Sequence, residues 1–470
     1  MGEEDATHYD RMCREVARGQ RFICAGQVLV VACQIARRLI GLGAEAFALG
    51  SGRGTGDIDA DVPHHLLDLG PADSAMAGIR LGLSALERPS REVESRLDDF
   101  DPTRTARVVL PFFSTSTHVL RRRVFGGRPP EWAALEDKTT VDALWDAAGV
   151  PRAPAEIVEA RLEPAWAAAQ ALDEGHGTVW VADNKQGWHG GAEYLRWVRT
   201  EVQARATAHE LGPVADRFRV MPFLEGLPCS IHGLVLPDHV VTFRPLEMVV
   251  LRKPGQTRLH YAQVSSFWEP SSPVVEALRA TARRVGAHLR ERVGYRGAFT
   301  VDGVLTARGF RPTELNPRYG AGLTFLADGI PGLWLYLLHL CMVEGLELDW
   351  RPRALEELVL SGSRRRRAAG GMASVARAFP EPRTLRLGLR DGAWHVLSDP
   401  ETPADATARL GPGPTGGVVM VRLDPERTPV GPSSAPRIAG VLMCLDEHLD
   451  LGLGPLEAAP DLAERTSPTT

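Results

Sequence analysis

Two stretches near residue 300 alternate apolar and polar side chains, and only three residues separate them. The segments 296–306 and 310–316 therefore predict two neighbouring strands. Residues 307–309, Ala-Arg-Gly, predict a three-residue hairpin loop with glycine at its left-handed position. With that loop, Thr306 and Phe310 form the flanking pair of an antiparallel hairpin.

This register gathers polar side chains on one face of the hairpin. Counting outward from the loop, Asp302 faces Glu314 and Thr300 faces Asn316, and side chains two residues apart share a face. Two opposed carboxylates repel each other unless a cation lies between them. Oxygen ligands on short side chains suit Mg²⁺, which takes further ligands from water and substrate phosphates. We predict a magnesium–nucleotide site at Asp302, Glu314 and Asn316; the alternative is a surface hairpin with two unrelated acids.

The residues after the hairpin add a positive charge. Pro317 restricts the backbone, and the Arg318 guanidinium suits bidentate contact with phosphate or carboxylate. A strand acid followed by Glu-x-Asn-Pro-Arg, here Asp302 and residues 314–318, resembles the magnesium end of the site in the ATP-grasp superfamily. The resemblance covers residues 131–355, about half of the chain. It implies the ATP-grasp fold, with ATP and Mg²⁺ as cofactors.

Composition is that of an ordinary globular protein. The chain has 470 residues, 44% of them apolar and 24% charged, which allows more than one buried core. A net charge of −5 provides no bulk attraction to nucleic acid or to an anionic membrane. The six cysteines form no Cys-x-x-Cys pair, and the acidic N-terminus lacks the apolar core of a signal peptide. These features predict a cytoplasmic protein with reduced thiols.

We predict an α/β (α+β) protein in three parts. Residues 1–130 form an N-terminal α/β domain, residues 131–355 a two-lobed ATP-grasp domain, and residues 356–470 a small C-terminal domain. Within the last part, the basic segment 363–372 predicts a hinge, and the tail from Asp461 predicts disorder. Further elements are predicted in all three parts: strands near 178–181, 230–236, 240–250, 384–389, 394–397 and 417–423, and helices from Pro273, over 333–343 and around 441–449.

The N-terminal part has a strand–helix–strand pattern. Residues 28–31 and 46–49 predict strands on either side of a helix at 34–42, and residues 107–113 predict another strand. We interpret the glycine run 50–56 as a mobile loop. Dinucleotide binding is the weaker alternative, because the third glycine does not fit that fingerprint. The charged, proline-containing stretch from Arg121 to Pro130 predicts a linker to the second part.

Only three lysines occur in the chain, whereas arginine is abundant. A lysine that survives such a bias is expected where a compact ammonium is needed. The resemblance implies that Lys138 and Lys185 hold the α/β-phosphate end of the nucleotide. Arg244 and Lys253 would reach phosphate or a substrate carboxylate, and solvated surface charge is their alternative.

A glycine-rich loop follows the strand at 178–181. Gly187, Gly190 and Gly191 would let backbone N–H groups approach phosphate oxygens. The resemblance implies that this loop folds over the triphosphate, and a plain turn is the alternative. Relatives place a lysine followed by a proline on the strand, where this chain has Ala182-Asp183, so the equivalence of Lys185 stays open.

A connector between two lobes is predicted next, at Phe223, Leu224 and Glu225. The resemblance implies that its backbone reads the adenine edge and that Glu225 holds the ribose hydroxyls. A second acid, which often follows in relatives, is absent here.

The resemblance implies a ligase that activates a carboxylate as an acyl phosphate, releases ADP and joins the acyl group to an amine. Arg318, Lys185 and Arg244 are the candidate catalytic residues. The domain arrangement and residues 187–191 most resemble stand-alone pheganomycin-type peptide ligases of antibiotic and other secondary-metabolite biosynthesis. That likeness implies an amino-acid-like acid as donor and an amino acid or peptide as acceptor, with no nucleic-acid or membrane partner, and it leaves a homodimer open.

Three other functions stay open. An ATP-grasp acid–thiol ligase or carboxylase would use the same cofactors, although the chain has no biotinylated Met-Lys-Met segment. A catalytically silent ATP-binding regulatory protein would keep the fold without turnover. A nucleic-acid binder, suggested by the arginine clusters at 121–123 and 364–367, is the weakest alternative because of the net charge.

Overall fold

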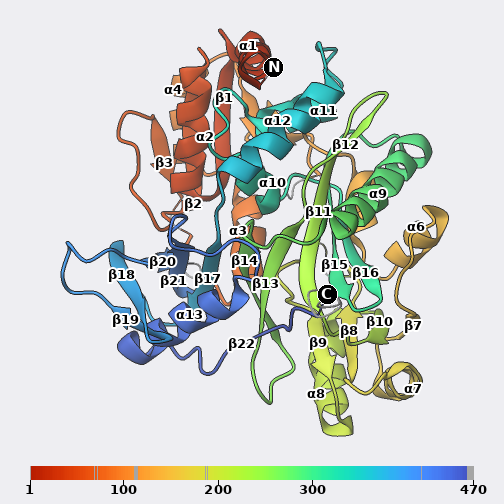
Figure 1. Ribbon diagram of the computed structural model, residues 1–470. Helices are drawn as coiled ribbons and strands as arrows, with labels where there is room; N and C mark the ends of the chain where they lie inside the picture. Colours follow the sequence, from red (N-terminus) through yellow and green to blue (C-terminus); the bar gives the residue numbers. More distant parts are fainter. Residues whose placement is uncertain are drawn as a thin grey trace.

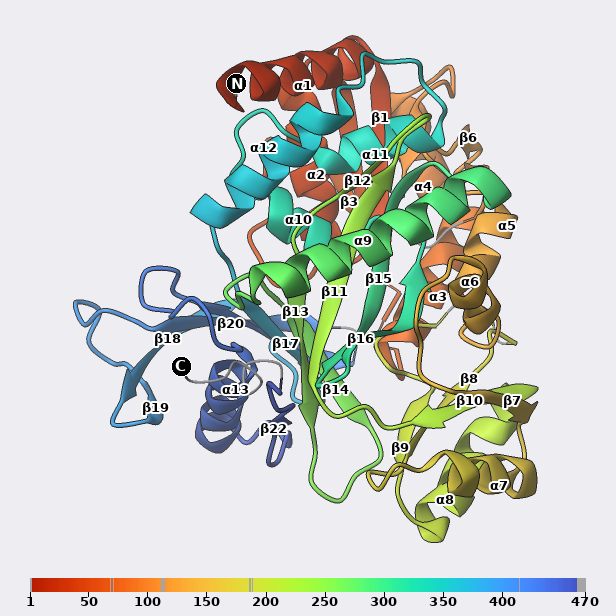
Figure 2. The same ribbon diagram turned by 45° about the vertical axis from the view of Figure 1, so that its right-hand side comes forward.

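The computed structural model describes residues 2–67, 69–70, 72–110, 115–185, 187, 189–413 and 415–462. This part of the chain contains four sheets of at least four strands and one two-stranded ribbon. Figure 1 shows the N-terminal sheet at the upper left, the largest sheet through the centre and the C-terminal sheet at the lower left. Figure 2 shows a small lobe below the largest sheet. Among the described helices, none has the length and apolar character required to cross a bilayer.

The N-terminal sheet is parallel, with strand order β3-β2-β1-β4. The predicted order of strand, helix and strand is confirmed, but the strand predicted at 28–31 is wrong. A helix already begins at Leu29 and buries Leu29 and Val30, and a short apolar run does not distinguish a buried helical turn from a strand. Residues 111–113 of the strand predicted at 107–113 lie outside the described residues. The elements are α1 (Gly2–Ala17), β1 (Arg21–Val28), α2 (Leu29–Gly41), β2 (Glu45–Gly52), β3 (His64–Leu66), α3 (Ala75–Glu87), α4 (Arg91–Phe100) and β4 (Arg107–Val109).

A buried ion pair anchors the stretch that was predicted as a linker. β5 (His118–Val119) and β6 (Arg122–Arg123) form a short antiparallel ribbon. Arg122 Nε donates to Asp101 Oδ2 at 2.7 Å, and its other nitrogens donate to the carbonyls of Leu97 and Leu120. Both charged side chains are almost fully buried. The linker prediction is therefore wrong for this segment, because a run of arginines does not reveal a buried partner 21 residues away.

The small lobe is an antiparallel sheet with strand order β7-β10-β8-β9. Trp180, Phe218 and Val220 pack against the alanine-rich faces of two helices and form its core. Its elements, with the short helices that precede them, are α5 (Pro130–Ala133), η1 (Ala134–Glu136), α6 (Val141–Ala147), β7 (Glu156–Glu159), α7 (Leu162–Leu172), β8 (Thr178–Ala182), β9 (Leu195–Val198), α8 (Glu201–Leu211), η2 (Gly212–Val214) and β10 (Arg217–Pro222).

The largest sheet has seven strands along the path β14-β13-β11-β15-β16, with β12 beside β11 and β22 beside β13. One helix packs its predicted apolar stripe on this sheet, and three later helices share a core with α1 and α2. The helices predicted from Pro273 and over 333–343 are confirmed. The elements are β11 (Leu227–Val235), β12 (Val240–Thr242), β13 (Leu246–Arg252), β14 (Leu259–Ser265), α9 (Ser272–His288), the π-helical turn η3 (Leu289–Val293), β15 (Gly297–Thr306), β16 (Gly309–Asn316), α10 (Ala321–Ala327), α11 (Leu335–Val343), α12 (Pro352–Arg365) and β22 (Glu457–Ala458).

The β15–β16 hairpin turns earlier than predicted. Thr306 pairs with Gly309, so the turn contains two residues and the predicted pair of Thr306 with Phe310 is wrong. A β-bulge then shifts the register by one residue beside Pro312. Proline has no N–H for the ladder, so an irregularity of the pairing is expected at this position.

The bulge restores the predicted pairing at the polar end of the hairpin. Asp302 faces Glu314 and Thr300 faces Asn316, as predicted. The shorter turn and the extra residue of the bulge therefore cancel. Without the bulge, a two-residue turn would have placed Thr313 opposite Asp302.

The C-terminal sheet is antiparallel, with strand order β17-β21-β20-β18-β19, and α13 packs on it. The three strands predicted here are confirmed, and the helix predicted at 441–449 is the second half of α13. The segment 363–372 ends α12 and begins β17, so no separate hinge lies there, and residues 463–470 of the predicted disordered tail lie outside the described residues. The elements are β17 (Gly370–Val375), β18 (Arg383–Arg390), β19 (Ala393–Val396), β20 (Ala406–Gly413), β21 (Gly416–Leu423) and α13 (Ala435–Leu449).

A buried carboxylate joins α13 to the largest sheet. Glu247 on β13 accepts the backbone N–H groups of Ser434 and Ala435 at 2.8 and 3.1 Å, together with the Ser433 hydroxyl. These donors belong to the N-terminus of α13, where backbone N–H groups have no partner within the helix. Burial raises the pKa of Glu247 to about 7.

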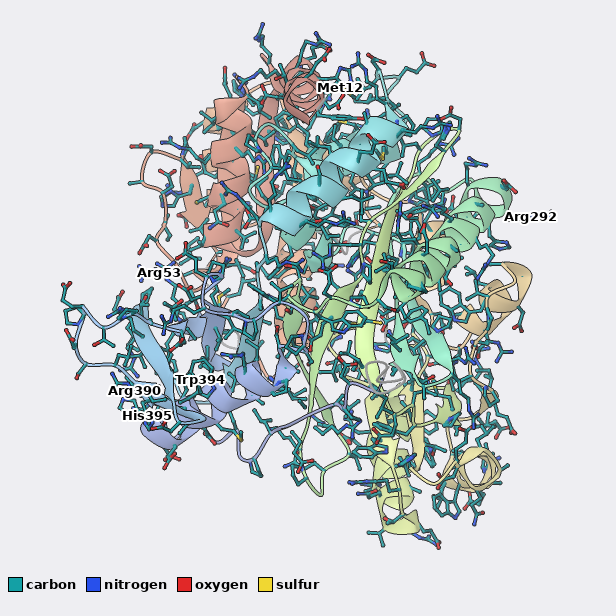
Figure 3. All side chains as sticks on the ribbon, viewed as in Figure 1. Met12, Arg53, Arg292, Arg390, Trp394 and His395 are labelled. Atoms are coloured by element: carbon teal, nitrogen blue, oxygen red, sulfur yellow. The ribbon has the colours of Figure 1, made fainter. Side chains whose placement is uncertain are left out.

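The glycine run 50–56 contacts the C-terminal sheet. Thr55 Oγ1 donates to the carbonyl of Pro412 at 3.4 Å, and Arg53 pairs with Glu381 at 3.0 Å. Figure 3 shows Arg53 at this junction and Trp394 farther out, beside α13. The run therefore lies against a second sheet in this structure, although the sequence suggested a mobile loop.

Candidate active site

Asp302 lies at the centre of a polar cluster on the largest sheet. Ser230 on β11 pairs with Asp302 across the ladder, and its hydroxyl donates to Asp302 Oδ1 at 2.5 Å. Asn316 Nδ2 donates to Asp302 Oδ2 at 2.8 Å. Burial raises the pKa of Asp302, and the charge of Glu314 raises it further. Neutral donors thus fix both oxygens of Asp302, and the two acids together form a negative site that a cation would stabilise.

Lys138 contributes a positive charge at this site. It lies between η1 and α6, and its Nζ is 3.0 Å from Glu314 Oε1. Both side chains are largely buried. The structure therefore brings the lysine predicted for the phosphates into contact with a predicted metal ligand.

The donor set fits Mg²⁺. Asp302, Glu314 and Asn316 offer carboxylate and amide oxygens, and the ladder holds the two acids as a direct pair. Asn316 Oδ1 accepts Arg318 Nη2 at 2.8 Å, so a metal ion at that oxygen would replace this donor. Within the described ranges, no three His, Cys, Asp or Glu side chains form a metal-ligand group. A site with two carboxylates and an amide leaves positions for water and phosphate, as Mg²⁺ usually requires.

A buried acid orients Arg318. Glu136 Oε1 accepts Arg318 Nε at 3.1 Å and also accepts Arg128 Nη1. Burial alone would raise the pKa of Glu136, but the positive charges of Arg318 and Arg128 outweigh it and lower the pKa below its ordinary value. Arg128 also donates to the carbonyl of Pro317 at 3.3 Å. Glu136 and Arg128 therefore hold both the backbone and the guanidinium of the Pro317–Arg318 step.

The structure places Lys185 at the edge of the small lobe. Its Nζ is 2.7 Å from Asp216 Oδ1, and the side chain is substantially exposed. Asp183, just after the end of β8, is buried and accepts the backbone N–H groups of Arg217 at 2.9 Å and Lys185 at 3.3 Å. Asp183 thus anchors the start of the glycine loop, and the structure does not bring Lys185 to the acid pair.

The end of the glycine loop lies near Lys138. His189 is buried, with Nε2 3.2 Å from the Ala182 carbonyl. Burial lowers the pKa of His189 to about 4, and the positive charge of Lys138 contributes to this lowering. Gly187 and Gly191 have φ of +84° and +60°, and a Cβ at either position would meet open space. Gly190 lies between His189 and Gly191, and Trp188 lies outside the described residues.

The predicted connector joins β10 to β11. Phe223 stacks on Trp197, with ring centroids 4.1 Å apart. The Glu225 carboxylate accepts Arg252 Nη1 at 3.1 Å and Nη2 at 2.9 Å, so the predicted ribose acid is in a bidentate pair. Leu224 lies between Phe223 and Glu225 in the chain, and Lys253 directly follows Arg252.

Arg244 lies apart from this group. Its buried guanidinium donates to Glu269 Oε2 at 2.9 Å and to the carbonyl of Trp268 at 3.3 Å. Arg367 pairs with the same carboxylate at 2.5 Å. The structure therefore places Arg244 in an ion-pair network next to the end of α12, away from the acids of the hairpin.

No protein-family model matches the sequence, and no curated protein matches it. Solved structures match almost the whole chain. A Campylobacter jejuni biotin carboxylase in complex with β-γ-ATP has a TM-score of 0.53 and 14% identity, covering 96% of this chain and 95% of that chain. An N5-carboxyaminoimidazole ribonucleotide synthetase in complex with ADP has a TM-score of 0.51 and 12% identity, covering 92% and 98%.

A third match is the biotin carboxylase domain of Hydrogenobacter thermophilus 2-oxoglutarate carboxylase, a dimer with MgADP, ADP and bicarbonate. Its TM-score is 0.51 at 13% identity, over 94% of this chain and 91% of that chain. These neighbours are ATP-grasp enzymes. The chain has the ATP-grasp fold. At such low identities the likeness establishes the fold alone, and the predicted fold class is confirmed.

Three residues around the ATP-grasp hairpin were not predicted. Ser230 is 72 residues from Asp302 in the chain, and Glu136 is 182 residues from Arg318. Tyr261 on β14 is the third: burial raises the pKa of its phenol, and the charges of Asp302, Arg318 and Glu314 also act on that pKa. For Ser230, its place in the alternating pattern of β11 was an available signal, whereas nothing in the local sequence marks Glu136 or Tyr261.

Proposed function

We propose that the protein is an ATP- and Mg²⁺-dependent carboxylate–amine ligase that forms ADP. The observation that carries this proposal is the cluster of Asp302, Glu314 and Asn316 with Lys138 and Arg318 on an ATP-grasp fold. The solved neighbours are complexes with β-γ-ATP, ADP or MgADP, which supports the same cofactors here.

The proposed chemistry depends on position and charge. Asp302, Glu314 and Asn316 would hold Mg²⁺, which when bound neutralises charge on the β- and γ-phosphates. Lys138 would add its ammonium to the phosphates from its place beside Glu314. Arg318, oriented by Glu136, would stabilise the negative charge of the transferring phosphoryl group and of the later tetrahedral adduct.

Two steps follow from this arrangement. A carboxylate oxygen of the donor attacks the γ-phosphorus, and the bond to the ADP oxygen breaks. The amine then attacks the acyl carbon, loses a proton to solvent and expels inorganic phosphate. Because water would hydrolyse the acyl phosphate, we assign to the loop with Gly187, Gly190 and Gly191 the exclusion of solvent.

The nucleotide base would lie at the connector. The backbone of Phe223 and Leu224 would read the adenine edge, and Glu225 would hold the ribose after exchanging part of its pair with Arg252. Lys253 would contribute charge at the same end. Lys185 would reach the phosphates only after release from Asp216, so Lys138 has the larger predicted role.

The acceptor is proposed to be an amino acid or peptide amine, and the donor an amino-acid-like acid, in secondary-metabolite biosynthesis in the cytoplasm. The support is the resemblance of residues 187–191 to stand-alone peptide ligases, since the matched structures cover almost the whole chain and share its architecture. A carboxylase is the second candidate, because the matched structures include biotin carboxylases and a carboxyaminoimidazole ribonucleotide synthetase. For that function, bicarbonate would replace the organic acid.

The test is a product assay with purified protein, Mg-ATP, pools of amino-acid-like acids and peptide amines, and hydroxylamine as a trap. We expect ADP and phosphate, together with a hydroxamate or amide from one acid pool. ADP formation that requires only bicarbonate would favour the carboxylase. AMP with pyrophosphate would contradict acyl-phosphate chemistry, and no turnover in any pool would favour a silent nucleotide binder.

A further inference from the structure

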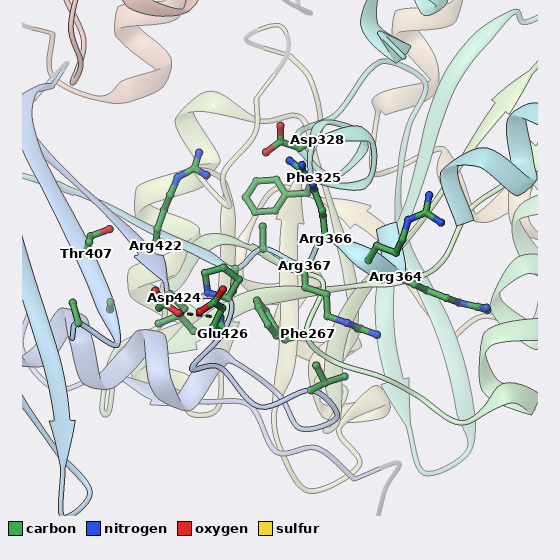
Figure 4. A pocket seen from close by; sticks show the side chains of 18 residues that line it. Phe267, Phe325, Asp328, Arg364, Arg366, Arg367, Thr407, Arg422, Asp424 and Glu426 are labelled. Carbon is green, nitrogen blue, oxygen red and sulfur yellow. Dashed lines mark hydrogen bonds between the residues drawn. The ribbon is translucent and has the colours of Figure 1, made fainter. Parts of the chain in front are cut away.

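A large cavity lies between α12, α10 and the C-terminal sheet. Its volume is about 790 Å³, within the roughly 300–1,000 Å³ typical of small-molecule sites. The lining includes the arginines 364–367 from the end of α12, and Arg422 from β21. Figure 4 shows the guanidinium groups of Arg366 and Arg422 on either side of the Phe325 ring, while Arg364 and Arg367 extend away from that ring.

The charges of Arg366 and Arg422 are not neutralised by the protein. Neither side chain forms an ion pair with any described residue, and the same holds for Arg364 and Arg365 in the same lining, whereas three other nearby arginines do form ion pairs. Arg244 and Arg367 share Glu269, and Arg427 pairs with Asp405 at 2.7 Å. Two guanidiniums that face one cavity and form no ion pair among the described residues are suited to bind a carboxylate or phosphate from outside the chain.

The stem of the exposed Arg366 side chain packs against a turn at Gly329. Gly329 follows Asp328 with φ of +76°, and a Cβ at Gly329 would lie 2.3 Å from Arg366 Cδ. Glycine therefore allows the stem of Arg366 to pack against this turn. At Gly370 a Cβ would lie 3.5 Å from Phe325 Cζ, which is an ordinary van der Waals contact.

The rest of the lining limits the charge of the ligand. Asp328, Asp424 and Glu426 line the cavity as acids, and Asp424 Oδ1 accepts the backbone N–H of Glu426 at 2.9 Å. These acids would repel a polyphosphate or a nucleic-acid backbone. The cavity thus suits a ligand with a single anionic group near Phe325 and an apolar or neutral body.

The α10 helix connects this cavity to the proposed reaction centre. Arg318 lies just before α10, and Phe325 and Asp328 lie at its end. Seven helical residues rise about 10 Å. A carboxylate in the cavity is therefore too far from Arg318 to be the donor carboxylate that is phosphorylated. An extended peptide of three or four residues, at about 3.3 Å per residue, would span this separation.

We propose that the cavity binds the C-terminal carboxylate of a peptide acceptor of three to four residues, through Arg366 and Arg422, so that its amine reaches Arg318. This inference rests on the proposed function for the identity of the acceptor. The anionic site itself depends only on the cavity and its arginines.

Equilibrium dialysis of the full-length protein with a pool of mixed-sequence tetrapeptides tests the assignment. One pool carries free C-terminal carboxylates, and a second pool of the same sequences carries C-terminal amides. We expect wild-type protein to retain the free acids about 10-fold better than the amides, because a charge-assisted contact is lost on amidation. In the double variant Arg366→Gln/Arg422→Gln the preference disappears, whereas the control Arg390→Gln keeps it.

Binding of MgADP by the same samples separates the two proposals. Intact nucleotide binding in the double variant shows that the protein is folded and that the loss is local to the cavity. The wild type could show the carboxylate preference, and the double variant lose it, while the wild type binds no MgADP. That result would support the cavity assignment and contradict the proposed function. Equal retention of acids and amides by wild type, or a preference that survives in the double variant, would overturn the cavity assignment.

Discussion

Glu136→Gln tests how the buried acid positions Arg318. The substitution keeps the shape of the side chain but removes the negative charge between Arg128 and Arg318. Glu136 is 2% exposed, and removal of one partner from a buried ion pair typically costs about 3–5 kcal/mol. The amide oxygen of Gln still accepts one hydrogen bond, so we expect the free energy of unfolding to fall by about 3 kcal/mol, the low end of that range.

The pH dependence of this loss has a defined sign. Because the folded-state pKa of Glu136 lies below its ordinary value, its charge stabilises the folded protein at neutral pH. That contribution is lost as the pH falls through the folded-state pKa. Glu136→Gln should therefore melt several degrees below wild type at pH 7, and the difference between the two should narrow on acidification.

Activity provides the second readout for Glu136. A guanidinium that is no longer held should lower kcat about 10-fold or more while the KM for Mg-ATP changes little, since a misplaced group impairs the reaction more than binding. The control is Glu131→Gln, an exposed acid on α5 five residues earlier. If Glu136→Gln melts like Glu131→Gln and keeps the wild-type kcat, Glu136 does not orient Arg318.

Four further substitutions test other parts of the structure. Glu314→Gln should reduce Mg²⁺-dependent turnover at least ~100-fold, which corresponds to about 3 kcal/mol of lost charge stabilisation. Its melting temperature should stay close to wild type, because the substitution also removes the repulsion of Asp302. Steady-state rates across Mg²⁺ concentrations, with Glu159→Gln as the control, check this. Lys138→Met should weaken ADP binding in calorimetry by about 10-fold, and full affinity would contradict its phosphate role. The folded-state pKa of Glu247 is raised to about 7, so its contribution to stability is fully present below about pH 4.5 and is lost as the pH rises through 7. Denaturant midpoints of the wild type should therefore fall between about pH 4.5 and 7. The midpoints of Glu247→Gln should change less over the same pH range. Asp101→Asn should destabilise the N-terminal sheet by about 3 kcal/mol in denaturant titrations, and an unchanged midpoint would show that the Arg122 pair contributes little.

The central hairpin could be predicted because its information is local. Alternation places Glu314 and Asn316 on one face of their strand, and the polar ends pair with Asp302 and Thr300 as predicted. The turn itself was predicted wrongly, since an Ala-Arg-Gly sequence allows both a two-residue and a three-residue loop. The bulge beside Pro312 adds one residue and restores the predicted pairing of Asp302 with Glu314. This bulge is visible only in the three-dimensional structure.

The surroundings of the hairpin could not be predicted in the same way. Glu136 contacts Arg318 through tertiary structure, across most of the ATP-grasp core, and Arg122 finds its buried acid by the same means. The sequence marked Arg318 as a ligand-binding residue and Arg122 as part of a charged linker. Lys185 illustrates the converse: it occurs near the expected position in the sequence, but the small lobe pairs it with Asp216.

The central claim is that Asp302 and Glu314 hold Mg²⁺ together with a nucleotide. The most direct measurement is calorimetric titration of ADP into wild type and into the double variant Asp302→Asn/Glu314→Gln, each with and without Mg²⁺. We predict that Mg²⁺ increases the affinity of wild type for ADP by 10-fold or more and has no effect on the double variant, which should still bind ADP weakly through the connector. Equal enhancement of ADP affinity by Mg²⁺ in both proteins would contradict the proposed metal site.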